Sequence, residues 1–87
     1  MAALQTNPHS GIVRDASILD GEPVVKGTRI PVRSIAILCR LYHTMDTIRA
    51  AYPMLSEDAI NEALMFYGMH WQEIEQYIAE NEDGDHE

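Results

Sequence analysis

Residues 21–32, with the sequence GEPVVKGTRIPV, constrain the fold of this chain more than any other segment. Pro23 and Pro31 have no N–H to donate to a strand ladder, so each must lie at a strand end or on a sheet edge. Gly21 and Gly27 stand where the chain needs tight turns, because glycine adopts a positive φ without a steric penalty. Together with residues 12–14, which begin with the β-branched Ile12 and Val13, the segment predicts two or three short strands that form a β-hairpin.

Beyond this segment, apolar residues recur with the 3.6-residue period of an α-helix. The first helix is expected to begin at Val32, with an apolar stripe formed by Ile35, Ala36, Leu38, Cys39 and Tyr42. Thr44 is placed to cap a short second helix, which Pro53 must end, and Ser56 is placed to cap a third.

The third predicted helix has a stripe that consists of Ala59, Ile60, Ala63, Leu64 and Tyr67 and resumes at Trp71, Ile74 and Ile78. We expect a break or kink at Gly68, followed by a fourth helix or a continuation of the third over residues 73–79. Short strands followed by three or four helices indicate an α+β fold that is mainly α.

The chain has 87 residues, which is enough for one domain with a thin core. We expect a flexible tail at residues 1–10, the folded domain at residues 11–79, and an acidic tail at residues 80–87. A homodimer would add buried surface to so small a domain. One cysteine, no signal-peptide pattern and no apolar run of membrane-spanning length favour a cytoplasmic protein without a membrane partner.

Charge divides sharply along the sequence. All six lysines and arginines lie in residues 1–49 beside four acids, which leaves +2, whereas residues 50–87 contain ten acids and no base. This division suggests that the two halves meet different partners. The net charge of −8 argues against strong nonspecific binding to nucleic acid, which depends on cations that replace phosphate counterions.

Residues 44–67 have the size of a helix-turn-helix. Glu57 and Asp58 would open its second helix, and carboxylates there disfavour entry into a DNA groove. Arg33 and Arg40 are seven residues apart and share a helix face, so they could form a modest cationic patch with Lys26 and Arg29. Scattered solubilising charges explain the same residues equally well.

Nothing in the sequence favours an enzyme, a metal site or a cofactor. The four histidines are spread without ligand spacing, and Cys39 lies inside an apolar helical run, which is typical of a buried, inert thiol. His70 stands three residues before Glu73, but two such residues are too few for a metal site. We therefore expect a non-enzymatic protein that binds other macromolecules.

Residues 21–32 and the later block TMDTIRAAYPMLS, residues 44–56, resemble the two signature blocks of the domain-of-unknown-function 433 (DUF433) family. Where that family usually has a glycine to end the first helix, this chain has Tyr42, so either Tyr42 adopts the cap conformation or the helix ends differently. The resemblance implies a short N-terminal β-hairpin followed by a three- to four-helix, winged helix-turn-helix-like bundle.

Members of that family resemble VapB-type antitoxins, so the resemblance implies an antitoxin that binds and neutralises a PIN-like ribonuclease toxin. It also implies a homodimer and, as a further role, binding to operator DNA. We place any DNA or dimer contact on the hairpin and first helix, at Lys26, Gly27, Thr28, Arg29, Ile30, Arg33 and Arg40. We place toxin binding in the acidic half, at Glu62, Tyr67, His70, Trp71, Glu73, Tyr77 and Glu80. A stand-alone transcriptional regulator and a structural dimerisation module remain the alternatives.

Overall fold

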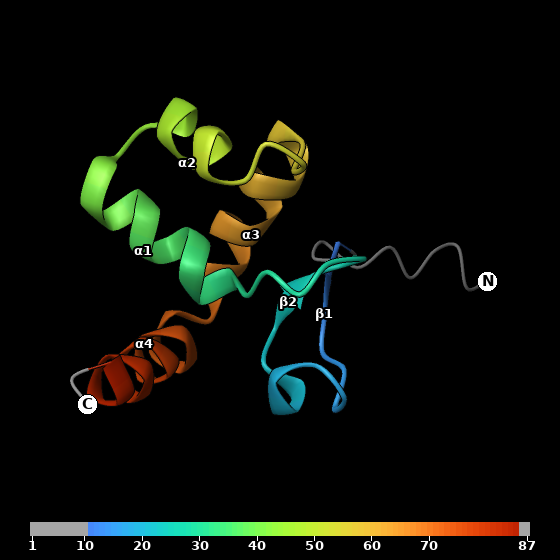
Figure 1. The fold of residues 1–87 in the computed structure, drawn as a ribbon, viewed down its shortest axis with the longest axis vertical. Coiled ribbons are helices and arrows are strands. Elements are labelled where there is room, and N and C mark those ends of the chain that lie inside the picture. The colour runs from blue at the N-terminus through green and yellow to red at the C-terminus, as the bar shows by residue number, and fades with distance from the viewer. Residues whose placement is uncertain (1–10, 86–87) are drawn as a thin grey trace.

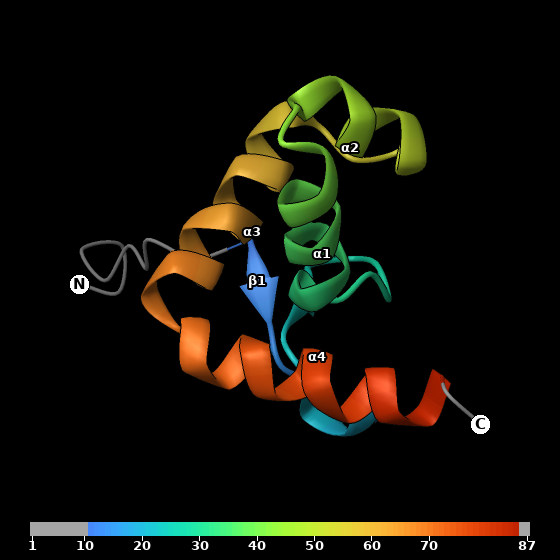
Figure 2. The same cartoon turned by 90° about the vertical axis from the view of Figure 1, so that its left-hand side faces the viewer.

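A computed structural model describes residues 11–85 of the chain, so the predicted N-terminal tail lies outside the described residues. Its elements are β1 (Ile12–Val13), the 3-10 turn η2 (Leu19–Gly21), β2 (Val24–Val25), α1 (Val32–Tyr42), α2 (Met45–Ala51), α3 (Glu57–Met69) and α4 (Trp71–Asp85). Figure 1 shows α1, α2 and α3 packed together, with the β-hairpin beside them. Figure 2 shows α4 passing across the end of α1 and α3. The predicted α+β, mainly α fold is confirmed.

The hairpin is shorter than the sequence predicted. β1 and β2 pair antiparallel, with Ile12 opposite Val25 and Val13 opposite Val24. Beyond the turn at Gly27, which has φ of 81°, only Pro31 rejoins the sheet, through an isolated bridge to Val24. Val24 is fully buried between these two neighbours. The third of the two or three predicted strands is therefore reduced to one bridge, because Pro31 cannot donate a ladder hydrogen bond and α1 begins at the next residue.

Tyr42 does not adopt the cap conformation at the C-terminus of α1. Tyr42 is the last helical residue, and His43 adopts the left-handed conformation, with φ of 62° and ψ of 17°. The His43 N–H donates to the Cys39 carbonyl at 2.9 Å. The helix thus ends in a left-handed cap one residue after Tyr42.

The two predicted N-caps are confirmed. Thr44 Oγ1 accepts from the Thr47 N–H at 3.2 Å, and Ser56 Oγ accepts from the Ala59 N–H at 3.1 Å. Each bond satisfies one of the N–H groups that the first turn of a helix leaves unpaired. The helices α2 and α3 that they open both pack on α1 and on each other.

The prediction of a break at Gly68 is wrong, because Gly68 lies inside α3. The chain turns instead at His70, which has φ of −127° and ψ of 36°. The His70 N–H closes α3 on the Phe66 carbonyl, and the His70 carbonyl accepts the first bond of α4 from Ile74. α4 then continues to Asp85, so helix extends into the segment that we expected to be a tail.

One apolar core joins the elements. Its most deeply buried side chains come from β2, from every helix and from the start of the hairpin: Ile12, Val24, Val25, Val32, Ile35, Ala36, Ile48, Leu55, Ile60, Ala63, Phe66, Ile74 and Ile78. Two residues of the predicted stripes are exposed instead of packing against this core. Tyr42 is 53% exposed at the last turn of α1, and Trp71 is 55% exposed where α4 begins after the turn at His70. Phe66 takes a core position that the sequence pattern did not assign.

Candidate functional site

A cluster centred on Arg14 and Glu73 ties the end of β1 to the start of α4. Arg14 Nη2 donates to Glu73 Oε1 at 3.0 Å, and Nη1 contacts the other carboxylate oxygen. The guanidinium also lies over the Phe66 ring, 5.5 Å from its centroid. The His70 ring stacks on the same Phe66 ring, with 4.2 Å between the two centroids. The Arg14 hydrogen bond lowers the pKa of the Glu73 carboxyl. Glu73 is therefore held as a carboxylate by its own chain.

A second polar cluster joins α1, α3 and α4. The Glu75 carboxylate on α4 accepts hydrogen bonds from the Arg40 guanidinium and from the Tyr67 hydroxyl. The hydrogen bond from Arg40 is the largest cause that lowers the pKa of Glu75, and the bond from Tyr67 is the second. The same bond to Glu75 raises the pKa of the Tyr67 hydroxyl. Arg40 thus faces α4 and stabilises the packing of α1 on that helix.

The third ion pair is the most buried. Arg33 Nε lies 2.6 Å from Glu22 Oε2, and the two side chains are 17% and 6% exposed. Neither of these two atoms has a hydrogen-bond partner among the described residues. Burial raises the pKa of the Glu22 carboxyl, and Arg33 offsets this only in part. The pair borders a hollow of about 300 Å³ whose walls also include Leu19, Asp20, Tyr77, Glu80 and Asn81.

These contacts correct the predicted cationic patch. Arg33 and Arg40 do share a face of α1, but that face meets Glu22 and Glu75 of the same chain. Among the described residues, no ion pair involves Lys26 or Arg29, which are both exposed at the hairpin turn. Of the four cations in the predicted patch, Lys26 and Arg29 are therefore the two without an ion pair among the described residues.

The rest of the predicted hairpin site has structural contacts. Thr28 Oγ1 donates to the Val25 carbonyl at 2.8 Å and accepts from the Ile30 N–H at 2.9 Å. Gly27 supplies the positive φ of the turn, and Ile30 packs against the core. Thr28, Gly27 and Ile30 hold the turn that presents the two cations.

Several residues predicted to bind a toxin also have partners within the chain. Glu62 accepts from the Gly11 N–H at 2.8 Å, which joins α3 to the start of the hairpin. Tyr67 and Glu73 belong to the two clusters above, His70 stacks on Phe66, and Tyr77 packs against the core. Trp71 and Glu80 remain exposed, although Glu80 accepts a 3.3 Å bond from Gln76 on the same helix. The division of charge is therefore partly internal, because the basic half pairs with the acidic half.

The sequence reasoning missed an uncharged surface on α3 and α4. Between residues 59 and 79, the exposed positions are Asn61, Met65, Gly68, Met69, Trp71, Gln72, Gln76 and Ala79. None carries a charge, because the three carboxylates of this stretch are turned toward Gly11, Arg14 and Arg40. The four-residue spacing of Met65 and Met69, off the core stripe, was the one signal in the sequence.

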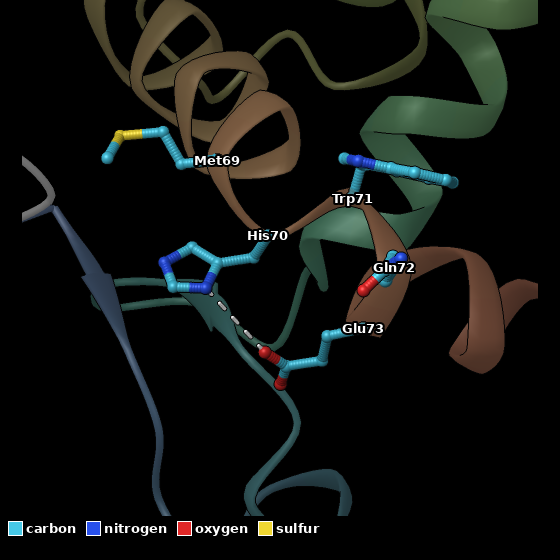
Figure 3. Close-up of a pocket in the computed structure, with 5 residues that line it drawn as sticks. All are labelled: Met69, His70, Trp71, Gln72 and Glu73. Atoms are coloured by element: carbon cyan, nitrogen blue, oxygen red, sulfur yellow. Dashed lines mark ion pairs between the residues drawn. The ribbon is translucent and has the colours of Figure 1, made fainter.

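A shallow hollow of about 260 Å³ lies on this surface, at the turn between α3 and α4. Figure 3 shows its walls, with Met69 and Trp71 projecting to opposite sides of the turn and His70 facing Glu73. The two atoms joined there, His70 Nδ1 and Glu73 Oε1, are 3.9 Å apart. The hollow combines exposed sulfur and indole surface with a few polar groups, which is typical of a surface that contacts another protein.

Other kinds of site find no support in this geometry. Within the part of the chain that the structure describes, no three side chains of histidine, cysteine, aspartate or glutamate are placed to hold a metal ion. Among the described helices, none has the length and apolar content that a membrane crossing requires.

Comparison with known proteins places the chain in a family. Residues 12–67 match the sequence profile of a family described as "Protein of unknown function (DUF433)". The chain belongs to the DUF433 family. Its fold is similar to that of a DUF433 member protein from Anabaena variabilis ATCC 29413, with a TM-score of 0.74 and 23% identity over 90% of this chain and 74% of that one. At that identity the likeness shows the shared DUF433 fold alone. No curated protein matched the chain.

Proposed function

We propose that this DUF433 protein is the antitoxin of a toxin–antitoxin pair and neutralises a PIN-like ribonuclease by covering its cationic RNA-binding surface. The observation that carries the proposal is the end of α4. Among the side chains that the structure describes, the last core residue of that helix is Ile78, and α4 continues to Asp85 with no basic residue in its last turn. Residues 80–85 contain Glu80, Glu82, Asp83 and Asp85.

This arrangement does not serve helix stability. The C-terminus of a helix carries a partial negative charge, so carboxylates there cost free energy and cations would be favoured. The four acids of residues 80–85, which we call the acidic arm, are thus better explained by a partner than by the fold. An anionic helix end can compete with RNA for a cationic groove and would speed association by electrostatic steering.

Binding to the purified ribonuclease encoded beside this protein tests the proposal. One variant replaces the acidic arm by amides, through Glu80→Gln, Glu82→Gln, Asp83→Asn and Asp85→Asn. We expect slower association and a weaker dependence on salt, with an unchanged or higher melting temperature. A control, Asp46→Asn, removes an exposed carboxylate on α2, away from the arm, and should bind like the wild type. Unchanged association by the arm variant would contradict the proposal.

A DNA-binding regulator is the second candidate, and the exposed Lys26 and Arg29 favour it. They lie on the hairpin turn, and α2 and α3 are consecutive helices of the kind that form a helix-turn-helix, although Glu57 and Asp58 open the second of these helices. Under this alternative, Lys26→Ala with Arg29→Ala reduces the salt dependence of binding to operator DNA by about two units of slope. The acidic-arm variant should bind the same DNA as well as the wild type or better.

A further inference from the structure

Gly68 is not explained by the fold of a single chain. It lies inside α3 with an ordinary right-handed backbone, so no turn requires glycine there. A Cβ at this position would meet no atom within 4 Å, so no close packing within the chain requires glycine either. A glycine inside a helix costs about 1 kcal/mol relative to alanine. Glycine is useful at such a site when another backbone approaches closely.

The surroundings of Gly68 are those of an interface. Met65 and Met69 lie on the outer side of α3 and are 56% and 67% exposed, and Trp71 follows at the start of α4. Successive helical residues are rotated by about 100°, so Gly68 lies beside both methionines. The hollow of about 260 Å³ adjoins them. One surface thus offers flexible side chains that project and a hollow that can receive them, as a twofold interface requires.

The distribution of charge favours a second copy of this chain as the partner that binds this surface. The chain carries a net charge of −8, so a second copy is repelled wherever carboxylates are exposed. Between residues 59 and 79 the exposed positions carry no charge. A cationic partner would instead be drawn to the acidic arm or to Glu57 and Asp58, the exposed carboxylates at the start of α3.

We propose that a second copy of this chain docks on the surface formed by Met65, Gly68 and Met69, which we call the elbow surface, around a twofold axis near Gly68. This interface differs from the hairpin, where we first expected dimer contacts. It does not depend on the proposed function, because it concerns the isolated chain.

Sedimentation equilibrium of the full chain over a concentration series tests the proposal. We expect a dimer that Gly68→Leu weakens at least tenfold, because the added side chain prevents close approach. Gly68→Ala should weaken it less while raising the melting temperature of the monomer. Met65→Glu should also weaken it, and added salt should strengthen the wild-type dimer by screening repulsion.

The matched control is Leu41→Glu, which places a charge at an apolar residue that is 60% exposed on α1. It should leave the dissociation constant of the dimer unchanged. Circular dichroism checks that every variant is folded. A wild-type chain that is monomeric at all concentrations would overturn the proposal. So would a dimer that tolerates both Gly68→Leu and Met65→Glu, or one that only Leu41→Glu disrupts. If the elbow variants impair only ribonuclease binding, a partner protein occupies the surface and the proposal is also wrong.

Discussion

Arg33 and Glu22 form the most buried ion pair among the described residues, with Nε and Oε2 2.6 Å apart. Arg33 lies in the first turn of α1, and Glu22 precedes β2 by two residues. The pair therefore anchors the hairpin segment to the helical bundle. A buried pair contributes little beyond an apolar replacement, but the loss of one partner leaves an uncompensated charge.

Replacing Arg33 alone should therefore be costly. Arg33→Met is expected to lower the free energy of unfolding by about 3 kcal/mol at pH 7. Because the pKa of Glu22 in the folded protein is raised, the neutral acid is favoured there, and stability is lost as the pH rises through that pKa. The cost of Arg33→Met should thus shrink as the pH falls toward and below 4.5, the usual pKa of the carboxyl. Urea unfolding at several pH values measures this.

The double variant Arg33→Met with Glu22→Gln is the control for this experiment. It removes the charge that the single variant leaves unpaired, so it should recover most of the lost stability at pH 7. A double variant as unstable as Arg33→Met would show that the side chains contribute through packing and not through charge.

The Arg14–Glu73 pair predicts the opposite dependence on pH. The pKa of Glu73 is lowered in the folded protein, so its contribution is present above 4.5 and is lost as the pH falls through the lower value. Both side chains are partly exposed, so Glu73→Gln should cost less than about 1 kcal/mol at pH 7 and nothing once the pH is well below the lowered pKa of Glu73. The control is Glu80→Gln, because Glu80 has no arginine partner among the described residues. Thermal unfolding of the two variants separates the effect of the Arg14–Glu73 ion pair from the effect of one fewer negative charge.

Features that depend on residues close together in the sequence, such as the helix caps, could be predicted. Features that depend on contacts between distant residues, such as the ion pairs, could not. Thr44 and Ser56 were identified as caps because each bond reaches only three residues along the chain. The partners of Arg33 and Arg40 were missed because Glu22 and Glu75 meet them only after α1 packs on the other elements. Helix periodicity placed both arginines on one face correctly but could not show that this face meets carboxylates of the same chain.

The break between α3 and α4 shows the same limit. Gly68 is the residue that a sequence pattern selects as a helix breaker, yet the chain turns at His70. His70 is held there by its stacking on Phe66 and by backbone bonds to both helices. Trp71 follows the apolar period but lies just after the turn, which leaves it exposed, and no pattern along the sequence indicates this.

His43 at the end of α1 predicts a stabilising substitution. A residue with a Cβ in the left-handed region is strained by about 1 kcal/mol, and glycine is not. His43→Gly should therefore raise the free energy of unfolding by about 0.5–1 kcal/mol, as measured in urea. His43→Val, which is β-branched, should lower it. A destabilised His43→Gly variant would show that the imidazole makes a contribution larger than the strain.

The cap at Ser56 predicts a loss of stability in α3. Ser56→Ala leaves the Ala59 N–H without its side-chain acceptor and should cost about 1 kcal/mol. Ser56→Asp should keep the cap and retain stability near that of the wild type. Equal unfolding curves for the wild type and Ser56→Ala would contradict a role for this cap in stability.

Inhibition of RNA cleavage by the neighbouring PIN-like ribonuclease tests the proposed function most directly. The wild-type chain is titrated against a fixed amount of the ribonuclease, beside the acidic-arm variant and the Asp46→Asn control. We predict that cleavage stops near equivalence with the wild type and the control, and that the arm variant requires a clear excess. Cleavage that continues unchanged in excess wild-type protein would contradict the account.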